Sequence, residues 1–272
     1  MRVPSGCFGC GLFDVAILAS GMPAGRLQEG DVVYTSMPNS ILPVNPRPDW
    51  SFGYREGSGE DLNMPDRLSD LSRAFDEWAQ NYDESVRQGC GVLEGHAQSL
   101  ARAAKLLPVE PGQKILDVGV GTGAFGDLFA QRGASVTGAD ISPRMLELAG
   151  RRHPQWRLLQ GHFLALPLED ASMDAAVSAF AFHHLETAEW SPALREVFRV
   201  LRGDTFLLVD ILFADTAGKD AARRQLAERW EEENYPVFPD LARSADQVGL
   251  SAAFTQLSSL HGAVLFGRAG QR

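Results

Sequence analysis

The sequence contains no uninterrupted apolar run of 18 or more residues, which argues against a membrane-spanning helix. It has only three cysteines among 272 residues, Cys7, Cys10 and Cys90. An odd number of cysteines does not form a disulfide framework, and it favours a reducing, cytoplasmic location. Basic residues are outnumbered, 25 Lys and Arg against 35 Asp and Glu, so the net charge of −10 argues against a nucleic-acid or anionic-membrane surface. A small-molecule partner is therefore expected.

Several signatures of catalytic and metal sites are also missing. The chain has no His-Glu-x-x-His pair, no serine elbow and no second Cys/His cluster. Cys7 and Cys10 have the spacing of half a zinc or redox site, but nothing in the sequence completes it. The sequence therefore predicts no metal site.

Residues 1–63 differ in composition from everything that follows. They hold six of the 15 prolines and nine glycines, and they show no helical period. Such a segment cannot easily form a packed core, so we predict a disordered extension. A second hypothesis is that Met64 is the true start of the protein, because the Gly, Glu and Arg codons of residues 55–61 are purine-rich, like a ribosome-binding site.

From residue 66 onward the pattern becomes helical. Apolar residues recur at three- and four-residue steps at Leu68, Leu71, Phe75, Trp78, Tyr82 and Val86. Residues 93–107 repeat the pattern and end before Pro108. These two segments predict an N-terminal helical cap over residues 66–107, within a domain that covers residues 64–272.

Strands and helices then alternate along the chain. Strands are predicted at 115–118, 135–139, 156–160, 174–180 and 206–211, and helices at 124–131, 143–151 and 192–201. Ser142 before Pro143 is typical of a helix start. Helices at 219–234 and 244–248 precede strands at 253–257 and 263–268, whose short connection requires antiparallel pairing. The pattern predicts an α/β fold with a parallel sheet between helices.

The segment over residues 114–126 combines a buried strand, a glycine turn and a helix start. Gly119, Gly121 and Gly123 would let the backbone approach a ligand closely, and unpaired N–H groups at the helix start suit an anionic group. The spacing Gly121-x-Gly123-x-x-Gly126, with Asp140 further on, also matches the dinucleotide fingerprint. One interpretation is therefore an NAD-dependent dehydrogenase.

Four motifs favour another interpretation. Residues 116–123, Leu-Asp-Val-Gly-Val-Gly-Thr-Gly, resemble the first motif of class I S-adenosylmethionine-dependent methyltransferases, and residues 138–146 resemble the second. Residues 161–174 and 178–185 resemble two later motifs of that family, in its order and spacing. The resemblance implies a three-layer Rossmann-like methyltransferase fold, with a seven-stranded, mostly parallel sheet whose last strand is antiparallel. In that fold Gly126 would permit close packing of a helix and would not bind a phosphate.

Further segments of the chain resemble the small-molecule members of this family. Residues 75–83 resemble the helix that begins many of them. Together with residues 213–215 and 234–237, they are most similar to the YrrT-like branch. The resemblance implies a cofactor, S-adenosyl-L-methionine, and a small-molecule methyl acceptor.

The resemblance also implies a set of cofactor-binding residues. They are Tyr82, Asp117, Gly119, Gly121, Gly123, Asp140, Ile141, His162, Phe163, Ala179 and Phe180. Asp140 would accept hydrogen bonds from the ribose hydroxyls, and Asp117 would orient the loop or reach the ammonium through water. His162 stands where the family usually has Asp. A neutral imidazole would accept from the adenine amino group, so we predict weaker binding once this ring is protonated.

The candidate catalytic residues are His183, His184 and Tyr235. Either histidine is a candidate general base, although in the resembling family the pair mostly shapes a loop. Methyl transfer from a sulfonium is a direct in-line displacement that needs neither a metal nor a covalent enzyme intermediate. We expect a monomer or homodimer that methylates a small molecule. A dehydrogenase and a non-catalytic S-adenosylmethionine-binding protein are the alternatives. The acidic residues 231–233 are interpreted as a solvated helix face.

Overall fold

The computed structural model describes residues 33–36, 66–79, 82, 91–230 and 232–270. Most of the predicted extension over residues 1–63, the proposed start at Met64 and all three cysteines lie outside these ranges. Within the extension, Val33–Ser36 form strand β1, where the sequence indicated no secondary structure. That expectation is therefore wrong for these four residues.

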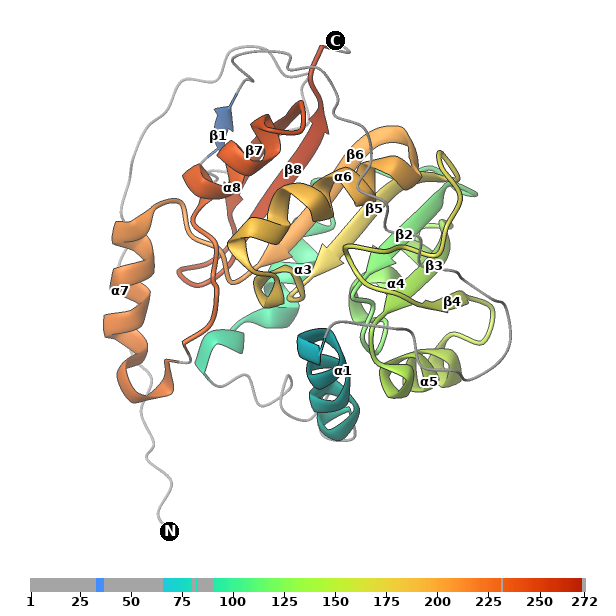
Figure 1. The fold of residues 1–272 in the computed structure, drawn as a ribbon, viewed down its shortest axis with the longest axis horizontal. Helices are drawn as coiled ribbons and strands as arrows, with labels where there is room; N and C mark the ends of the chain where they lie inside the picture. The colour runs from blue at the N-terminus through green and yellow to red at the C-terminus, as the bar shows by residue number, and fades with distance from the viewer. Residues whose placement is uncertain (1–32, 37–65, 80–81, 83–90, 231, 271–272) are drawn as a thin grey trace.

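The described residues form one sheet (Figure 1). Its main strands are β2 (Lys114–Val118), β3 (Ser135–Asp140), β4 (Arg157–Gln160), β5 (Met173–Ala179), β6 (Leu201–Asp210), β7 (Leu250–Gln256) and β8 (Gly262–Arg268). The order across the sheet is β1-β7-β8-β6-β5-β2-β3-β4. Strands β2 to β6 pair in parallel, and β8 is antiparallel to both of its neighbours, β6 and β7. The predicted seven-stranded sheet with an antiparallel last strand is confirmed, and β1 adds an antiparallel strand at its edge.

Strand β2 is the point where the chain order reverses, because β3 lies on one side of it and β5 on the other. Four of its five residues are buried, as expected for a parallel strand covered on both faces. In open α/β sheets the connections diverge at such a point and leave a crevice at the carboxyl ends of the strands. The glycine turn follows β2 directly, so the fold places it at this crevice.

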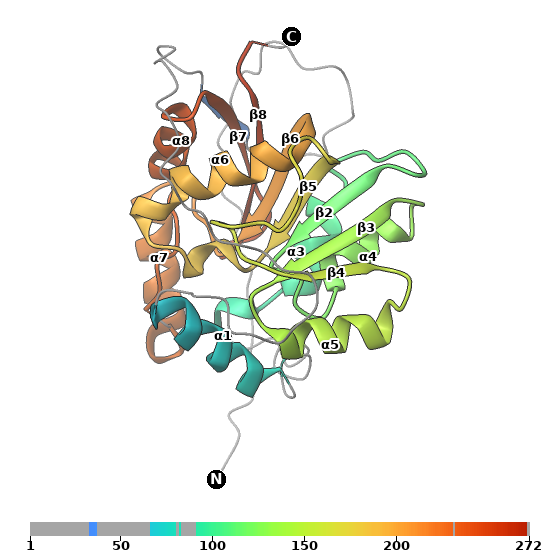
Figure 2. The same ribbon diagram turned by 45° about the vertical axis from the view of Figure 1, so that its right-hand side comes forward.

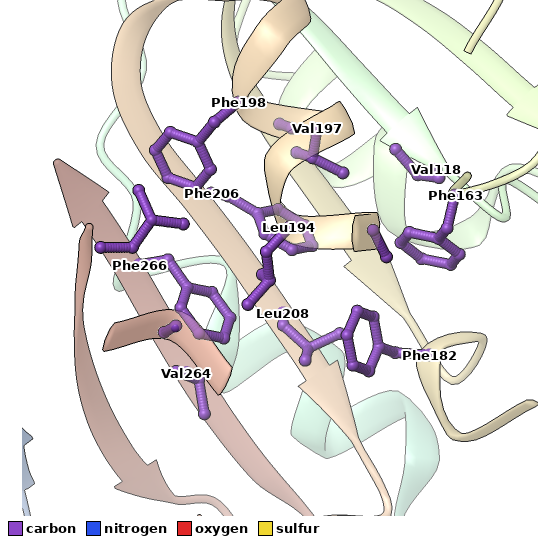
Figure 3. Packing of buried hydrophobic residues seen from close by; sticks show 14 of the residues in the cluster. Val118, Phe163, Phe182, Leu194, Val197, Phe198, Phe206, Leu208, Val264 and Phe266 are labelled. Carbon is purple, nitrogen blue, oxygen red and sulfur yellow. The ribbon is translucent and has the colours of Figure 1, made fainter. Parts of the chain in front are cut away.

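Helices cover both faces of the sheet. Helix α6 (Trp190–Val200) and helix α8 (Phe238–Asp246) share one buried apolar cluster with the strands. Figure 3 shows side chains of α6, among them Leu194 and Phe198, packed against Phe206 and Phe266 of the strands. Helix α3 (His96–Ala103) and helix α4 (Ala124–Ala130) share the cluster on the other face. The three-layer arrangement is confirmed.

Helix α1 (Asp66–Trp78) lies across the carboxyl ends of the parallel strands, beside α5 (Pro143–Arg152) (Figures 1 and 2). Polar contacts tie it to the loops that follow the strands. Ser72 Oγ donates to the carbonyl oxygen of Ile141 at 3.0 Å, and Arg67 Nη1 donates to the carbonyl oxygen of His184 at 3.0 Å. Helix α1 is thus the roof of the crevice.

Three predicted helices have different limits in the structure. The second cap helix is shorter than residues 93–107, because Gly95, with φ of +80°, separates the short turn Gly91–Leu93 from α3. The helix predicted over 219–234 is α7 (Thr216–Leu226), and it ends where Ala227 has φ of +48°. Helix α8 begins earlier than residue 244, and a proline stands in its first turn.

The start of α5 is confirmed in atomic detail, because Ser142 Oγ accepts a hydrogen bond from Met145 N at 3.0 Å and Pro143 is the first helical residue. None of the helices in the described ranges is long and apolar enough to cross a membrane.

Candidate active site

One pocket lies between α1 and the carboxyl ends of β2, β3 and β5. Twelve of the fourteen predicted site residues line it: Tyr82, Gly119, Gly121, Asp140, Ile141, His162, Phe163, Ala179, Phe180, His183, His184 and Tyr235. Asp117 lines a smaller pocket, which Tyr82, Gly119 and Gly121 also line. Gly123 lines neither pocket; it is the N-cap residue of α4, with φ of +92°. The sequence therefore located the pocket, and Gly123 shapes the turn behind it.

The glycine loop brings its backbone close to a neighbouring segment. Gly119 has φ of +71°, and a Cβ atom there would lie 2.5 Å from the Cβ of Ala181. The N–H groups of Gly119 and Val120 both donate to the carbonyl oxygen of Ala139, and the N–H of Gly121 donates to Asp140 Oδ2. The expectation of unpaired N–H groups is wrong for these three residues. The loop supplies close approach of the backbone rather than free donors.

Asp140 ends β3 and faces the pocket. Its Oδ2 accepts from Gly121 N at 2.7 Å, and its Oδ1 accepts from Ser142 N at 2.9 Å. Burial raises the pKa of this carboxyl to about 6, and the two N–H donors oppose that rise. Because a carboxylate oxygen can accept more than one hydrogen bond, both oxygens retain capacity for a ligand.

Asp117 is buried in β2 with 1% of its surface exposed. Its Oδ2 accepts from Gly126 N at 2.8 Å, and a Cβ at Gly126 would lie 2.8 Å from that oxygen. This contact explains why glycine stands there, and it confirms that Gly126 permits close packing. Within the part of the chain that the structure describes, Asp117 Oδ1 has no hydrogen-bond partner, and burial raises the pKa of the carboxyl to about 8. Such an oxygen is a candidate acceptor for a donor on a bound water or ligand.

His162 lies in a turn after β4 and is half-buried. Its Nδ1 lies 3.2 Å from Leu164 N, which donates to it, and burial lowers the pKa of the ring. A neutral ring whose Nδ1 accepts carries its proton on Nε2. In this ring orientation Nε2 is a donor, and the predicted acceptor role toward an adenine amino group stays a prediction.

His183 follows β5 and is held by a carboxylate that the sequence analysis overlooked. Asp210, fully buried at the end of β6, places Oδ1 at 2.5 Å from His183 Nδ1. The N–H groups of Phe182, His183 and Ile211 also donate to Asp210. The sequence offered one signal for Asp210, an acidic residue at the carboxyl end of an otherwise apolar strand.

Glu233 is a second overlooked residue of the pocket. Its Oε2 lies 3.4 Å from His183 Nε2 and 3.2 Å from His184 Nδ1. The histidine beside it, His184, holds the pKa of this carboxyl below its usual range. Glu233 is exposed, as a solvated residue would be, but the predicted helix is wrong at this position, because α7 ends at Leu226. Glu233 also lines the pocket.

Aromatic side chains close the remaining walls. Tyr82 contacts Trp78 of α1 with ring centroids 4.9 Å apart, and burial raises the pKa of its hydroxyl to about 12, so it stays neutral. Tyr235 is buried, with its ring centroid 5.6 Å from that of His183. The pocket therefore has a largely apolar and aromatic lining that also carries charged and polar side chains.

Comparisons with known proteins identify this architecture. A family model described as a methyltransferase domain matches residues 115–204. Over 198 residues, 68% of this chain and 91% of the relative, the sequence is 31% identical to "Uncharacterized methyltransferase OB1106" of Oceanobacillus iheyensis. It is 33% identical over 200 residues to "Uncharacterized methyltransferase GK2543" of Geobacillus kaustophilus, over 67% of this chain and 89% of that protein. This chain is a class I S-adenosylmethionine-dependent methyltransferase.

The fold of this methyltransferase is shared with proteins of low sequence identity. The magnesium protoporphyrin IX methyltransferase of Synechocystis PCC 6803, solved with bound SAH, superposes with a TM-score of 0.60 at 17% identity. The match covers 75% of this chain and all of that protein. The dehydrogenase interpretation of the glycine loop is thereby corrected, because the relatives and the fold belong to methyltransferases. The YrrT-like branch stays a prediction.

The residues of the methyltransferase pocket fit S-adenosylmethionine. This cofactor carries an ammonium donor, and Asp117 Oδ1 is a buried oxygen without a partner among the described residues. It also carries ribose hydroxyls, and Asp140 faces the same pocket as the glycine loop. Because Gly119 has no Cβ, the glycine loop can approach Ala181 closely. We therefore assign S-adenosylmethionine to this pocket, and the residue-by-residue contacts stay predictions.

Proposed function

We propose that this methyltransferase transfers the methyl group of S-adenosylmethionine to a small molecule by direct in-line displacement. One observation carries the proposal. Gly119 and Asp140 line the same pocket as Glu233 and Tyr235, together with side chains of α1. We call the part beside the first pair the cofactor end and the part beside the second pair the acceptor end. A concave pocket with a mostly apolar lining suits small molecules rather than a polymer.

The cofactor end of the pocket would hold the nucleoside and amino-acid parts. Asp140 would accept from the ribose hydroxyls, and Asp117 would accept from the ammonium through Oδ1. The proton on His162 Nε2 would face an acceptor nitrogen of the adenine ring. Tyr82 would also contact the cofactor, because it lines both pockets.

The acceptor end has apolar side chains together with the polar group formed by His183 and Glu233. Leu68, Leu71 and Phe75 of α1 line it, and His183 and Glu233 lie at its far side. An apolar acceptor that carries one protic heteroatom would match this lining, because its body would contact α1 while the reacting atom meets the polar group. That group would take part in removing the proton from the acceptor.

Beyond binding the two reactants and removing the proton, the reaction requires no further chemical group from the protein. The attacking lone pair forms a bond to the methyl carbon as the carbon–sulfur bond breaks, and the sulfonium becomes an uncharged thioether. Holding the two reactants in line and away from water supplies much of the acceleration in such a transfer. Helix α1, tied to the loops after β3 and β5 by Ser72 and Arg67, would provide this enclosure.

Two measurements test the proposal. Calorimetry with S-adenosylmethionine is expected to show one site per chain, and Asp140→Asn is expected to weaken it by about tenfold or more. Incubation with methyl-labelled S-adenosylmethionine and size-fractionated metabolites is expected to move label into small molecules. Binding without transfer to any fraction would instead support the non-catalytic alternative, and label in protein or nucleic acid would refute the small-molecule acceptor.

A further inference from the structure

The acceptor end of the pocket brings together three side chains with the donor atoms of a metal site. His183, His184 and Glu233 each direct one ligand atom toward the others, and these atoms lie within 4.8 Å of one another. We propose that they bind a divalent metal ion of the zinc type. Binding of the ion is independent of the proposed function, whereas its role in the reaction rests on that function.

The two separations that involve Glu233 agree with tetrahedral coordination. Zinc binds nitrogen at about 2.0–2.1 Å and carboxylate oxygen at about 2.0–2.2 Å, so two tetrahedral ligands lie roughly 3.3–3.5 Å apart. Glu233 Oε2 is 3.4 Å from His183 Nε2 and 3.2 Å from His184 Nδ1. Both observed separations lie at or just below this range.

The orientation of His183 strengthens the inference. Its Nδ1 lies 2.5 Å from Asp210 Oδ1, so Nδ1 carries a proton and donates it. In the neutral ring the lone pair of Nε2 then points toward an anionic oxygen of Glu233. Two acceptors that face each other repel unless a proton or a metal cation lies between them, and a metal cation would satisfy both rings and the carboxylate at once. Metal-bound histidines commonly donate their second N–H to a carboxylate in this way.

Asp210 is built for such a supporting role. It is fully buried and accepts three backbone N–H groups in addition to the imidazole. A carboxylate held this firmly fixes both the tautomer and the direction of the His183 ring. Asp210 is therefore a positioning residue, which acts on the ion only through His183.

Three protein ligands leave a fourth position for a small ligand, as in catalytic zinc sites. All three side chains line the pocket, so that position faces the acceptor. The acceptor class we infer is a hydroxyl or thiol on an otherwise apolar molecule. On binding to the ion, its proton would pass to solvent, and its oxygen or sulfur would then bond to the methyl carbon while the carbon–sulfur bond of the cofactor breaks.

Metal binding can be measured without either substrate. The full chain, first stripped with a chelator, is titrated with Zn²⁺ against a chromophoric chelator and with Co²⁺ by visible absorption. We expect one equivalent of ion and the intense absorption of tetrahedral Co²⁺. His184→Ala and Glu233→Gln are each expected to weaken binding by at least tenfold. Glu232→Gln is the matched control, because Glu232 is exposed and pairs with Arg223.

A second variant distinguishes the pocket from the amino-terminal segment. Cys7→Ser combined with Cys10→Ser removes the other zinc-like spacing in the sequence. The proposal requires that this double variant keeps the ion. Loss of the ion from the cysteine variant alone, or no stoichiometric ion in the wild type, would overturn it. Either result would leave the histidines and Glu233 as an imidazolium–carboxylate group.

Positioning by Asp210 has its own readout. Asp210→Asn is expected to shift the Co²⁺ absorption and weaken binding by about 10–100-fold, the range for supporting carboxylates. Unchanged calorimetric binding of S-adenosylmethionine would show that each variant is folded. Because ion and cofactor are measured separately, loss of the ion with intact cofactor binding refutes only the metal site, and absence of cofactor binding in the wild type refutes only the proposed function.

Discussion

Asp117 should make the binding of S-adenosylmethionine depend on pH near neutrality. In the ligand-free protein, burial raises the pKa of this carboxyl from 3.8 to about 8. At pH 7 the group is therefore mostly protonated, whereas an ammonium would bind the ionised form. Binding must then release a proton, and affinity must rise as the pH rises toward 8.

The size of the effect follows from the shift. With a pKa of about 8, Asp117 is about half ionised at pH 8, so affinity should fall about fivefold from pH 8 to pH 7. From pH 7 to pH 6 it should fall about tenfold more, because well below the pKa each pH unit adds about 1.4 kcal/mol for removing the proton. Asp117→Asn has no proton to release. It should lose the slope and, at pH 8, bind about 10–150-fold more weakly, because a hydrogen bond between charged groups contributes about 1.5–3 kcal/mol.

Calorimetry from pH 7 to pH 8.5 on both proteins, in buffers of different ionisation enthalpy, measures affinity and proton release together. The amino group of the ligand also titrates near pH 8, but it does so identically for both proteins, so the ratio of affinities isolates Asp117. Asp140, with a pKa of about 6, is ionised throughout this range. Parallel pH profiles for the wild type and Asp117→Asn would refute the reasoning.

Other substitutions test the loop, the adenine end and the start of α5. Gly119→Ala places a Cβ 2.5 Å from that of Ala181, so urea unfolding should show that the free energy of unfolding falls by at least about 2 kcal/mol. Gly112→Ala is the control and should lose less, because Gly112 also has a positive φ, +85°, but a Cβ there would meet no atom within 4 Å. His162→Asp should tighten cofactor binding about tenfold in calorimetry at pH 8, because a carboxylate accepts from the adenine amino group. Ser142→Ala should lose about 1 kcal/mol of stability by thermal unfolding, as expected for a lost N-cap.

The sequence was sufficient for the alternation of strands and helices because each element carries its own period and its own terminal residues. Strand β2 and the cap at Ser142 are local features, and both occur where the pattern indicates. The end of α7 was missed because residues 227–234 retain a helical composition. Trp230 packs instead against Phe213, with ring centroids 6.2 Å apart, and this tertiary contact outweighs local propensity.

The sequence predicted those parts of the site that a motif of consecutive residues forms. It did not predict the parts whose residues come from segments far apart in the chain. The glycine loop and Asp140 belong to such motifs. Asp210 lies 27 residues beyond His183, and Glu233 lies in a segment whose direction depends on the premature end of α7. The tautomer of His162 could not be predicted from the sequence, because it depends on a backbone N–H in a turn.

Ser142 shows how the roof and the cofactor end are linked. Its N–H donates to Asp140 Oδ1, its Oγ accepts from Met145 N, and the same Oγ donates to Asp76 of α1. Asp76 Oδ1 also accepts from Arg144 N. One buried serine therefore joins the helix start, the carboxylate assigned to the ribose and the roof of the pocket. Because these contacts share atoms, a displacement of α1 would disturb Asp140, and ribose binding at Asp140 would in turn stabilise α1 over the acceptor.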